Sequence, residues 1–498
     1  MITITFVVFL IAVIYYLVHL NHQHWKKRGI NGPQPIFLAG NMGRSILLQI
    51  QPGEIFTDIY RKYNNESIVG AFKSFTPFLL IRDPDLIKEI TIKSFSHFRD
   101  NDVEIDKKVD PIFGRNPFVL KGEEWKVVRA QLTPAFTSGK MKWLYPSWEN
   151  NSSKMVQFLE QRPNATNGNG YEAKELCTRF TLNNVGDSVF GIDAKCFDED
   201  NSEFRQLAKD FFTPGSWTII TILIANIFPF VMKILPIRFC PKSVEKKLTQ
   251  IVSQTLQYRE DNNIVRNDFL QIIRELKKTS KDYEFTDLDV TAHAAGFFGD
   301  GYETSSQVMS FVLYHLAANE DVQMKLRNEI NEAFDEKERL PYEVLQTLTY
   351  LDGVFNETLR LTPPVFFLQK MCTEDFSYVS KDSKSVLIEK GTPIVLPIYG
   401  LQTDPQYFED PESFKPERFL AENKERVKKC TFMPFGEGPR ACLGQRFGAL
   451  QVKVGVSYLI KNFELRLNKK TQVPLKFDPA NVLVAPVGGL WIDFKKIA

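Results

Sequence analysis

One decapeptide near the C-terminus constrains the fold of this chain more than any other segment. Residues 435–444 read Phe-Gly-Glu-Gly-Pro-Arg-Ala-Cys-Leu-Gly, so one cysteine, Cys442, stands between an arginine and a glycine just before a helix-like run. A thiolate that ligates a metal needs backbone N–H donors and a helix N-terminus to balance its charge, and this loop can supply both. Its glycines let the backbone approach a flat cofactor closely. The loop therefore predicts a thiolate ligand rather than a surface turn with a stray cysteine.

The loop closely resembles that of one known family. Its fixed positions Phe435, Gly438, Arg440, Cys442 and Gly444 match the ligand loop of the cytochrome P-450 family, in which a cysteine thiolate holds haem iron. The resemblance implies a mainly α fold with smaller β regions, built as a single large haem domain behind an N-terminal transmembrane helix. It also implies haem b as the cofactor and Cys442 as the axial ligand of its iron.

The length and composition of the chain fit one large domain. A length of 498 residues would allow about three domains, but residues 36–498 contain no Ser/Gly-rich linker, internal repeat or long charge block. We therefore expect one large core. The net charge of +2 argues against nucleic acid as a partner. The six cysteines show neither close pairing nor zinc-type spacing, which favours reduced thiols in the cytosol.

The N-terminus has the composition of a membrane anchor. Residues 2–20 carry no Asp, Glu, Lys or Arg, and the basic run Lys26, Lys27 and Arg28 follows them. The flanking positive charge predicts that the body of the protein stays on the cytoplasmic side. A cleaved signal peptide is the alternative, but no small-residue cleavage site follows the apolar stretch. We therefore divide the chain into a membrane anchor at 1–22, a basic and proline-containing hinge at 23–35, and a haem-thiolate catalytic domain at 36–498.

A second apolar stretch, residues 217–232, also lacks charge but is short for a membrane span and contains Asn226 and Pro229. Its periodicity is compatible with a buried helix and equally with a segment that dips into the membrane interface. The family resemblance favours the interface, because this region of the family borders the substrate channel. Lipophilic substrates would then enter from the bilayer.

Residues 286–318 are predicted to form one long helix, with Thr286 and Asp289 as its N-terminal cap. The segment Asp300-Gly-Tyr-Glu-Thr304 within it resembles the oxygen-binding motif of the family. The resemblance implies that Thr304 donates a hydrogen bond during oxygen activation and that Glu303 relays protons from solvent. The family usually has alanine or glycine at the position of Asp300. Because a buried acid is costly unless it is paired, we favour a structural hydrogen bond for Asp300 over a place in the proton relay.

Residues 342–361 read as a further helix that ends before Pro363 and Pro364. Glu357 and Arg360 lie three positions apart in it, which by itself predicts only a surface ion pair worth about 0.2–0.5 kcal/mol. The family resemblance adds Arg418, from the segment Pro-Glu-Arg-Phe, as the third member of a structural triad behind the cysteine loop.

Cofactor contacts are implied by the same resemblance. Trp125 and Arg129 lie one helical turn apart and match the pair with which the family holds a haem propionate. Arg440 is a further propionate partner, and Phe435 belongs to the cofactor-binding loop. Lys370 stands where the family commonly has arginine. The positive charge is kept, but the pair of parallel hydrogen bonds that a guanidinium makes to a carboxylate is lost.

The substrate pocket is expected to have aromatic walls, because the chain contains 41 phenylalanines, although most of them must be ordinary core. The candidates follow the family's substrate-contacting regions rather than any spacing rule. They are Phe113, Phe118, Phe211, Phe212, Phe297, Phe298, Phe366, Phe367 and Val484.

The reaction that the resemblance implies is monooxygenation of lipophilic small molecules. No Gly-rich nucleotide fingerprint or flavin domain is found, so electrons must come from a partner, which the resemblance implies is NADPH-cytochrome P-450 reductase, with cytochrome b5 as a second donor. Exposed cations at Lys424, Arg426, Lys428 and Lys429 would dock this partner, or form an ordinary solvated run. A likeness to insect microsomal members predicts a place on the endoplasmic reticulum membrane. It also predicts metabolism of xenobiotics, or of an endogenous lipid or hormone.

Two other functions remain open from the sequence. A haem-thiolate isomerase or dehydratase would keep Cys442 without needing the acid and alcohol at Glu303 and Thr304. A non-catalytic haem-binding or lipid-binding protein would bind lipophilic compounds and consume no NADPH.

Overall fold

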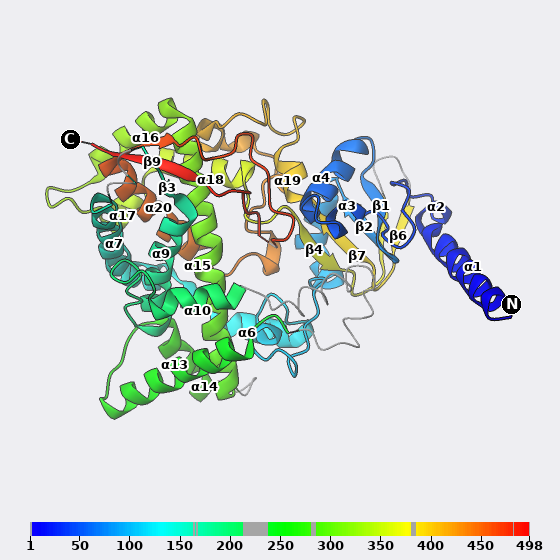
Figure 1. Cartoon of the computed structure of the whole chain (residues 1–498), viewed down its shortest axis with the longest axis horizontal. Helices are drawn as coiled ribbons and strands as arrows, with labels where there is room; N and C mark the ends of the chain where they lie inside the picture. The colour runs from blue at the N-terminus through cyan, green and yellow to red at the C-terminus, as the bar shows by residue number, and fades with distance from the viewer. Residues whose placement is uncertain are drawn as a thin grey trace.

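The computed structural model describes residues 2–162, 165, 168–212, 238–279, 285–379, 385–481 and 483–497. Figure 1 shows a large helical body joined to a smaller region that contains most of the strands, with the N-terminal helix extending away from both. The apolar stretch at 217–232 lies outside the described residues, so its expected immersion in the membrane stays a prediction. The family's mainly α architecture with smaller β regions is observed.

The α-helices of the described chain are α1 (Ile2–His22), α2 (His24–Lys27), α3 (Gly43–Ile46), α4 (Pro52–Lys62), α5 (Pro84–Lys88), α6 (Gly122–Leu132), α7 (Ser138–Glu160), α9 (Ala173–Val185), α10 (Glu203–Phe212), α13 (Lys242–Asp261), α14 (Phe269–Thr279), α15 (Asp287–Ala318), α16 (Glu320–Ala333), α17 (Tyr342–Leu345), α18 (Thr349–Leu361), α19 (Ile398–Gln402) and α20 (Gln445–Asn462). The strands are β1 (Ile68–Lys73), β2 (Thr76–Ile81), β3 (Tyr171–Glu172), β4 (Leu368–Met371), β5 (Phe376–Val379), β6 (Ser385–Ile388), β7 (Pro393–Leu396), β8 (Phe463–Leu467) and β9 (Trp491–Lys496).

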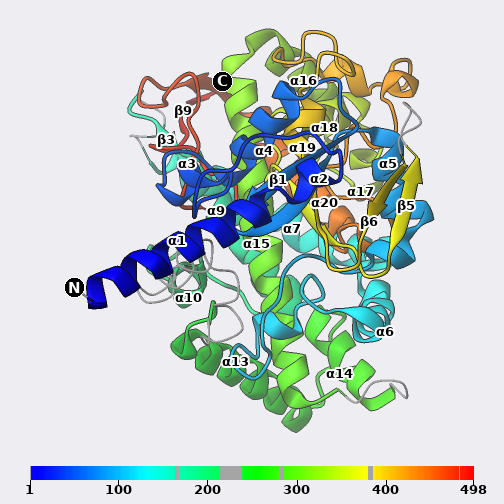
Figure 2. The same cartoon turned by 90° about the vertical axis from the view of Figure 1, so that its right-hand side faces the viewer.

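Helix α15 is the central element of the helical body, and both views show it running through the middle of the molecule (Figures 1 and 2). Its 32 residues span about 48 Å. It begins with a capping box, because the Thr286 side chain accepts the Asp289 N–H while the Asp289 carboxylate accepts the Thr286 N–H. Helices α9, α14 and α20 pack along it. The prediction of one long capped helix is confirmed.

The four-stranded sheet has the order β1-β2-β7-β4, with β2 and β7 parallel and the other two pairs antiparallel. Helices α4 and α19 pack together beside it. The sheet carries its own apolar cluster, distinct from the larger one in the helical body, and Phe367 contacts both. Two linked clusters thus replace the single core that we expected, because a sheet must bury its own apolar face. Strand β4 places Lys370 at the junction between the two regions.

Helix α1 has the length and apolarity of a membrane span, with residues 3–22 forming the candidate segment. Most of its large apolar side chains are exposed, and the helix projects from the body in both views (Figures 1 and 2). The predicted hinge that follows, residues 23–35, contains a short helix and a buried aromatic side chain. It begins with α2, where the Trp25 ring is buried against Gly70 and its Nε1–H donates to the Ala71 carbonyl at 3.0 Å.

The predicted helix at 342–361 is instead divided into α17 and α18, which corrects that expectation. The Thr347 hydroxyl donates to the Val344 carbonyl at 2.8 Å, which closes a turn after α17. The Glu329 carboxylate then accepts the backbone N–H groups of Tyr350 and Leu351 at 2.8 and 2.9 Å. These two N–H groups belong to the first turn of α18, so a carboxylate from α16 fixes the start of a new helix.

Candidate active site

The Cys442 loop lies between a short 3-10 turn at Gly438–Arg440 and the start of α20. The Cys442 N–H donates to the Phe435 carbonyl at 2.8 Å, which closes the loop. Gly438 has a φ of +72°, and a Cβ there would lie 1.9 Å from the Thr91 carbonyl oxygen, so only glycine fits. Cys442 has an exposed side chain, whereas the other five cysteines are buried.

The Cys442 thiol is exposed to an interior space rather than to the outer surface. Although its side chain is accessible, burial raises its pKa, and the negative charge of Asp300 on α15 raises it further. The Gly444 N–H and the Arg129 guanidinium act in the opposite direction. Asp300 shows the same combination of an exposed side chain and a pKa raised by burial. Both groups therefore face a space that protein surrounds, between the loop and α15.

Helix α6 brings Trp125 and Arg129 to the Cys442 loop. The Arg129 guanidinium donates to the carbonyl of Ala441, adjacent to the cysteine, at 2.7 Å. The Arg440 guanidinium lies 4.0 Å from the centre of the Trp125 ring, which is a cation–π contact. Arg440 also donates to the carbonyls of Arg99, Pro117 and Leu120 at 2.8–2.9 Å.

Buried positive charge gathers beside the loop. The side chains of Arg129, Lys370 and Arg440 form a group that we call the cationic cradle. Burial and, to a smaller extent, the neighbouring Arg440 lower the pKa of Lys370 from 10.5 to about 7, while Asp100 opposes the shift. Burial likewise lowers the pKa of Arg440 to about 10. The Lys370 ammonium donates to the neutral Asn101 amide oxygen at 2.9 Å.

Among the described residues, Asp100 is the one carboxylate that forms an ion pair with the cationic cradle, through Arg440 at 3.3 Å. Positive charge in the cradle thus exceeds negative charge. A cofactor with two carboxylates would supply the missing anions, and a thiol that faces the same space would supply a metal ligand. No described group of three His, Cys, Asp or Glu residues could hold a metal ion without such a cofactor. The donor set therefore fits haem.

The predicted triad is brought together, and it is buried rather than at the surface. The Arg360 guanidinium forms two hydrogen bonds with the Glu357 carboxylate, both at 2.8 Å, and neither side chain is exposed. Arg418, from the turn Pro416–Phe419, reaches the same carboxylate at 3.3 Å. Arg360 also donates to the carbonyls of Gln402, Pro411 and Ser413. The triad therefore ties α18 to the segment that precedes the cysteine loop.

Glu303 and Thr304 are adjacent in α15 but face different partners. The Thr304 hydroxyl donates to the Asp300 carbonyl at 2.7 Å, within the helix. The Glu303 carboxylate accepts from the Lys174 ammonium of α9 at 2.9 Å, and Lys174 also donates to the Ser306 hydroxyl at 2.7 Å. Glu303 is therefore held toward α9.

Asp300 has a hydrogen-bond partner that connects α15 to an earlier loop. The Asn116 side-chain amide donates to the Asp300 carboxylate at 2.9 Å, while its own oxygen accepts the Phe118 N–H at 2.8 Å. A neighbouring polar group of this kind is what we expected for Asp300.

Four predicted pocket residues lie together near α10 and α15. The rings of Phe113 and Phe211 are 5.2 Å apart, and Phe211 is 6.2 Å from Phe298. Phe212 packs on Phe211 and is 41% exposed. Gly299 makes room for Phe211, since a Cβ at this glycine would lie 2.6 Å from the ring. These side chains form a continuous aromatic group, whose member in α15, Phe298, lies two residues before Asp300.

The other five predicted pocket residues lie outside this aromatic group. Phe118 is exposed, Phe297 packs on Phe136 and Phe269, Phe366 stacks on Tyr399, Phe367 packs on Phe56, and Val484 donates its N–H to the Pro364 carbonyl. Phe366 and Val484 have no exposed surface. Their assignment to the pocket wall stays a prediction.

Three groups near the site were not found from the sequence. Asn116 and Lys174 come from segments without a recognisable motif. Each is more than 100 residues from its partner in α15, so the contact exists only in the folded chain. Asp100 neutralises part of the cationic cradle from a loop that bridges to β4. The sequence did indicate that such partners exist, because Asp300 and Glu303 are acids in a largely apolar helix and a buried acid needs a polar partner.

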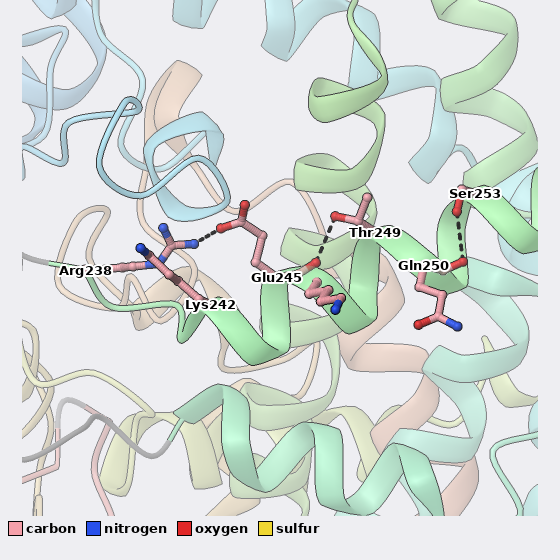
Figure 3. A pocket seen from close by; sticks show the side chains of 7 residues that line it. Arg238, Lys242, Glu245, Thr249, Gln250 and Ser253 are labelled. Carbon is pink, nitrogen blue, oxygen red and sulfur yellow. Dashed lines mark hydrogen bonds and ion pairs between the residues drawn. The ribbon is translucent and has the colours of Figure 1, made fainter.

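A separate hollow lies over the first turns of α13 (Figure 3). Arg238, Lys242, Glu245, Lys246, Thr249, Gln250 and Ser253 line it. Figure 3 shows Arg238 reaching toward Glu245, with which it forms an ion pair, and the Thr249 and Ser253 hydroxyls bonded to carbonyls of their own helix. None of the predicted site residues borders this hollow.

Comparison with known proteins places this arrangement in context. The family model described as "Cytochrome P450" matches residues 30–492. A protein named "Probable cytochrome P450 28a5" of Drosophila melanogaster is 33% identical, with 100% of both chains covered. "Cytochrome P450 6a2" of the same fly is 35% identical, with 97% of each chain covered. "Cytochrome P450 6j1" of Blattella germanica is 33% identical, covering 99% of this chain and 98% of the relative.

Proposed function

Because this chain belongs to the cytochrome P450 family and is a haem-dependent monooxygenase, we propose that it oxidises lipophilic small molecules with electrons from a separate NADPH-dependent reductase. The observation that carries the proposal is the accessible Cys442 thiol beside an excess of buried positive charge. Bound haem would supply the redox chemistry that activates O2, with one oxygen atom entering the substrate and the other leaving as water.

The cationic cradle would hold and orient the cofactor. Arg129, Lys370 and Arg440 would bind its two carboxylates, and these anions would offset the cost of burying Lys370 and Arg440 beside the half-buried Arg129. Trp125 keeps the Arg440 guanidinium in place through its ring face. The Phe435 carbonyl fixes the backbone of Cys442, so the thiolate meets the metal from a loop that cannot rearrange freely.

Protons would reach the reacting site through α15. The Thr304 hydroxyl is positioned by the Asp300 carbonyl, one helical turn earlier, and rotation about its side-chain bond would let it donate toward the site instead. Glu303 would collect protons from solvent. Its ion pair with Lys174 is partly exposed, at 23% and 22% for the two side chains, so exchange of the carboxylate between Lys174 and the site is feasible.

The reductase would bind beside the cysteine loop. Arg426, Lys428 and Lys429 are exposed, and Lys428 lies 3.5 Å from Asp85 in a weak ion pair. This basic surface matches an acidic electron-transfer partner, and cytochrome b5 would use the same surface. Reversing Lys428 and Lys429 to glutamate should raise the reductase concentration needed for half-maximal turnover. An unchanged requirement would identify the run as an ordinary solvated surface.

Membrane attachment would supply the substrates. Helix α1 would span the endoplasmic reticulum membrane, with residues 23–35 as the hinge and residues 36–498 as the catalytic domain on the cytoplasmic side. A membrane-bound enzyme meets compounds that partition into lipid. Xenobiotics, and endogenous lipids or hormones, are the proposed substrates.

The proposal is tested by reconstituting the purified protein with reductase, NADPH and a panel of lipophilic compounds under isotopically labelled O2. A monooxygenase incorporates one labelled atom per product molecule. Product without label would indicate an isomerase or dehydratase. Binding without NADPH consumption for every compound would indicate a carrier.

A further inference from the structure

We propose that Asp300 anchors a positively charged nitrogen of the substrate, so that lipophilic amines are a preferred substrate class. The proposal rests on the proposed monooxygenase function and names a substrate class for it. Four features of Asp300 support it: its access to the interior space, its incomplete hydrogen bonding, the absence of a described cation beside it, and its place in α15.

Asp300 faces the same interior space as the predicted metal ligand. Its side chain is accessible, and its charge is close enough to raise the pKa of Cys442. Thr304, which is proposed to donate a proton there, lies one helical turn later and bonds to the Asp300 carbonyl. A group bound to the Asp300 carboxylate therefore lies about one turn of helix, roughly 6 Å along the axis, from the proposed donor Thr304.

Only one of the two oxygens of the Asp300 carboxylate accepts a hydrogen bond from a described residue. Asn116 donates to its Oδ2 atom, and among the described residues no hydrogen bond reaches Oδ1. Asn116 fixes the orientation of the carboxylate, because Asn116 is itself buried and its side-chain oxygen accepts the Phe118 N–H. Gly296 allows this approach, because a Cβ there would lie 3.3 Å from the Asn116 amide nitrogen. One oxygen is thus free to meet a ligand.

No described cation pairs with Asp300. Arg115, next to Asn116 in sequence, is bound to Asp289 at 2.8 Å and to the carbonyls of Lys107 and Pro111. Burial raises the pKa of Asp300 to about 6, with only the Asn116 hydrogen bond opposing the shift. A carboxylate that is ionised near neutral pH without a counter-charge is costly in a desolvated place, and a ligand cation would remove that cost.

The surroundings suit the rest of such a molecule. Phe211, which contacts Phe113, Phe212 and Phe298, packs against Gly299, the residue that precedes Asp300 in α15. Apolar rings beside a single anion favour a compound with a lipophilic body and one basic nitrogen.

The test compares two ligands that differ only in charge. Phenylbutyltrimethylammonium has no lone pair and cannot ligate iron, and its neutral isostere carries a tert-butyl group in place of the trimethylammonium. Both are titrated into the haem-loaded wild-type protein and into Asp300→Asn, which keeps an acceptor for Asn116. Dissociation constants come from the Soret shift and from equilibrium dialysis.

We expect the wild type to bind the cation about tenfold more tightly than the isostere, and Asp300→Asn to lose that preference while binding the isostere as before. Asp287→Asn is the matched control, because it removes one charge from an exposed position on the same helix. It should leave the preference intact.

Equal binding of both ligands to the wild type would overturn the proposal, as would a parallel loss of both in Asp300→Asn. An Asp300-dependent gain with phenylpentanol, without a cation preference, would overturn it in favour of hydroxyl recognition. The reduced carbon monoxide spectrum is recorded for each protein. A normal thiolate-type spectrum together with no preference for the cation refutes the role of Asp300 but leaves the proposed function standing. A wild type that shows no thiolate-type spectrum refutes the proposed function.

Discussion

Two groups of buried arginine and lysine side chains lie near the cysteine loop, and they differ in how completely they are paired. In the Glu357 triad, one carboxylate serves two guanidinium groups, and backbone carbonyls take the remaining Arg360 donors. In the cationic cradle, Asp100 forms the one described ion pair, and burial lowers the pKa of both Lys370 and Arg440. Backbone carbonyls also accept from Arg440, so the two groups differ mainly in charge: two cations share one described carboxylate in the triad, whereas three share one in the cradle. An anion from outside would offset the larger excess in the cradle.

This difference separates a structural group from a binding group. A complete network stabilises the fold whether or not a ligand is present. An incomplete one lowers the stability of the empty protein and recovers that cost on binding, so it marks a ligand site. Substitutions in the two groups should therefore have opposite effects on the haem-free protein.

The largest expected effect is at Glu357. Glu357→Gln leaves Arg360 and Arg418 without their counter-charge in a buried place, so the free energy of unfolding should fall by about 3–5 kcal/mol. Urea denaturation of the haem-free protein measures this change. Glu417→Gln, which removes the exposed partner of Lys325 nearby, is the control and should change stability by less than about 1 kcal/mol. A similar small change for Glu357→Gln would show that the triad is not a structural unit.

Substitution of Lys370 should raise the stability of the haem-free protein and weaken its binding of haem. Lys370→Met removes a buried cation without a carboxylate partner, so the haem-free protein should gain about 1 kcal/mol of stability. The same change should weaken haem binding by about tenfold, because one propionate contact is lost. Thermal unfolding of the haem-free protein and transfer of haem to an acceptor globin measure the two effects. Loss of stability without loss of haem affinity would place Lys370 with the structural group.

Lys370 also predicts a pH dependence of stability. Its pKa in the folded haem-free protein is about 7, against an ordinary value of 10.5. Between these values the unfolded chain binds more protons at this residue than the folded protein does, so its contribution to stability rises as the pH rises from about 7 to 10.5. Unfolding free energies measured across this range should therefore show a rising contribution that Lys370→Met abolishes. An identical slope in the variant would contradict the assignment.

The smallest expected effect concerns the partly exposed pair of Lys174 and Glu303. Because such pairs are worth about 0.2–1 kcal/mol, Lys174→Met should lower the yield of product per NADPH by at most about fivefold. Thr304→Ala should lower this yield by more, since it removes the proposed donor itself. Reconstituted turnover with product and NADPH measured together gives both values. If Lys174→Met had the larger effect, Lys174 rather than Thr304 would be the main determinant of coupling.

The sequence predicted local features of the fold and site well. The cap of α15 and its full length depend on short-range patterns, and the structure places them as expected. The triad was implied by the family resemblance, and the structure brings Arg360 and Arg418 to Glu357. The burial of Glu357 and Arg360 was not predicted, because an i,i+3 pair has the same spacing at the surface and in the core. The break between α17 and α18 depends on Glu329, a residue distant in sequence.

Partners that come from distant segments were likewise missed. Asn116 and Lys174 contact α15 only after α9 and the loop before α6 have packed against it, and no motif marks either residue. The sequence likewise did not show which of the predicted pocket phenylalanines lie together. Phe211 and Phe298 lie together, but Phe297 turns to Phe136, since neighbouring positions of one helix face different sides.

The most direct test of the account is the reduced carbon monoxide spectrum of the purified protein and of Cys442→Ser. The account predicts a thiolate-type spectrum for the wild type and its loss in the variant, because Cys442 is the accessible thiol that faces the interior space with the cationic cradle beside it. A thiolate-type spectrum that survives in Cys442→Ser, or one that the wild type never shows, would contradict it.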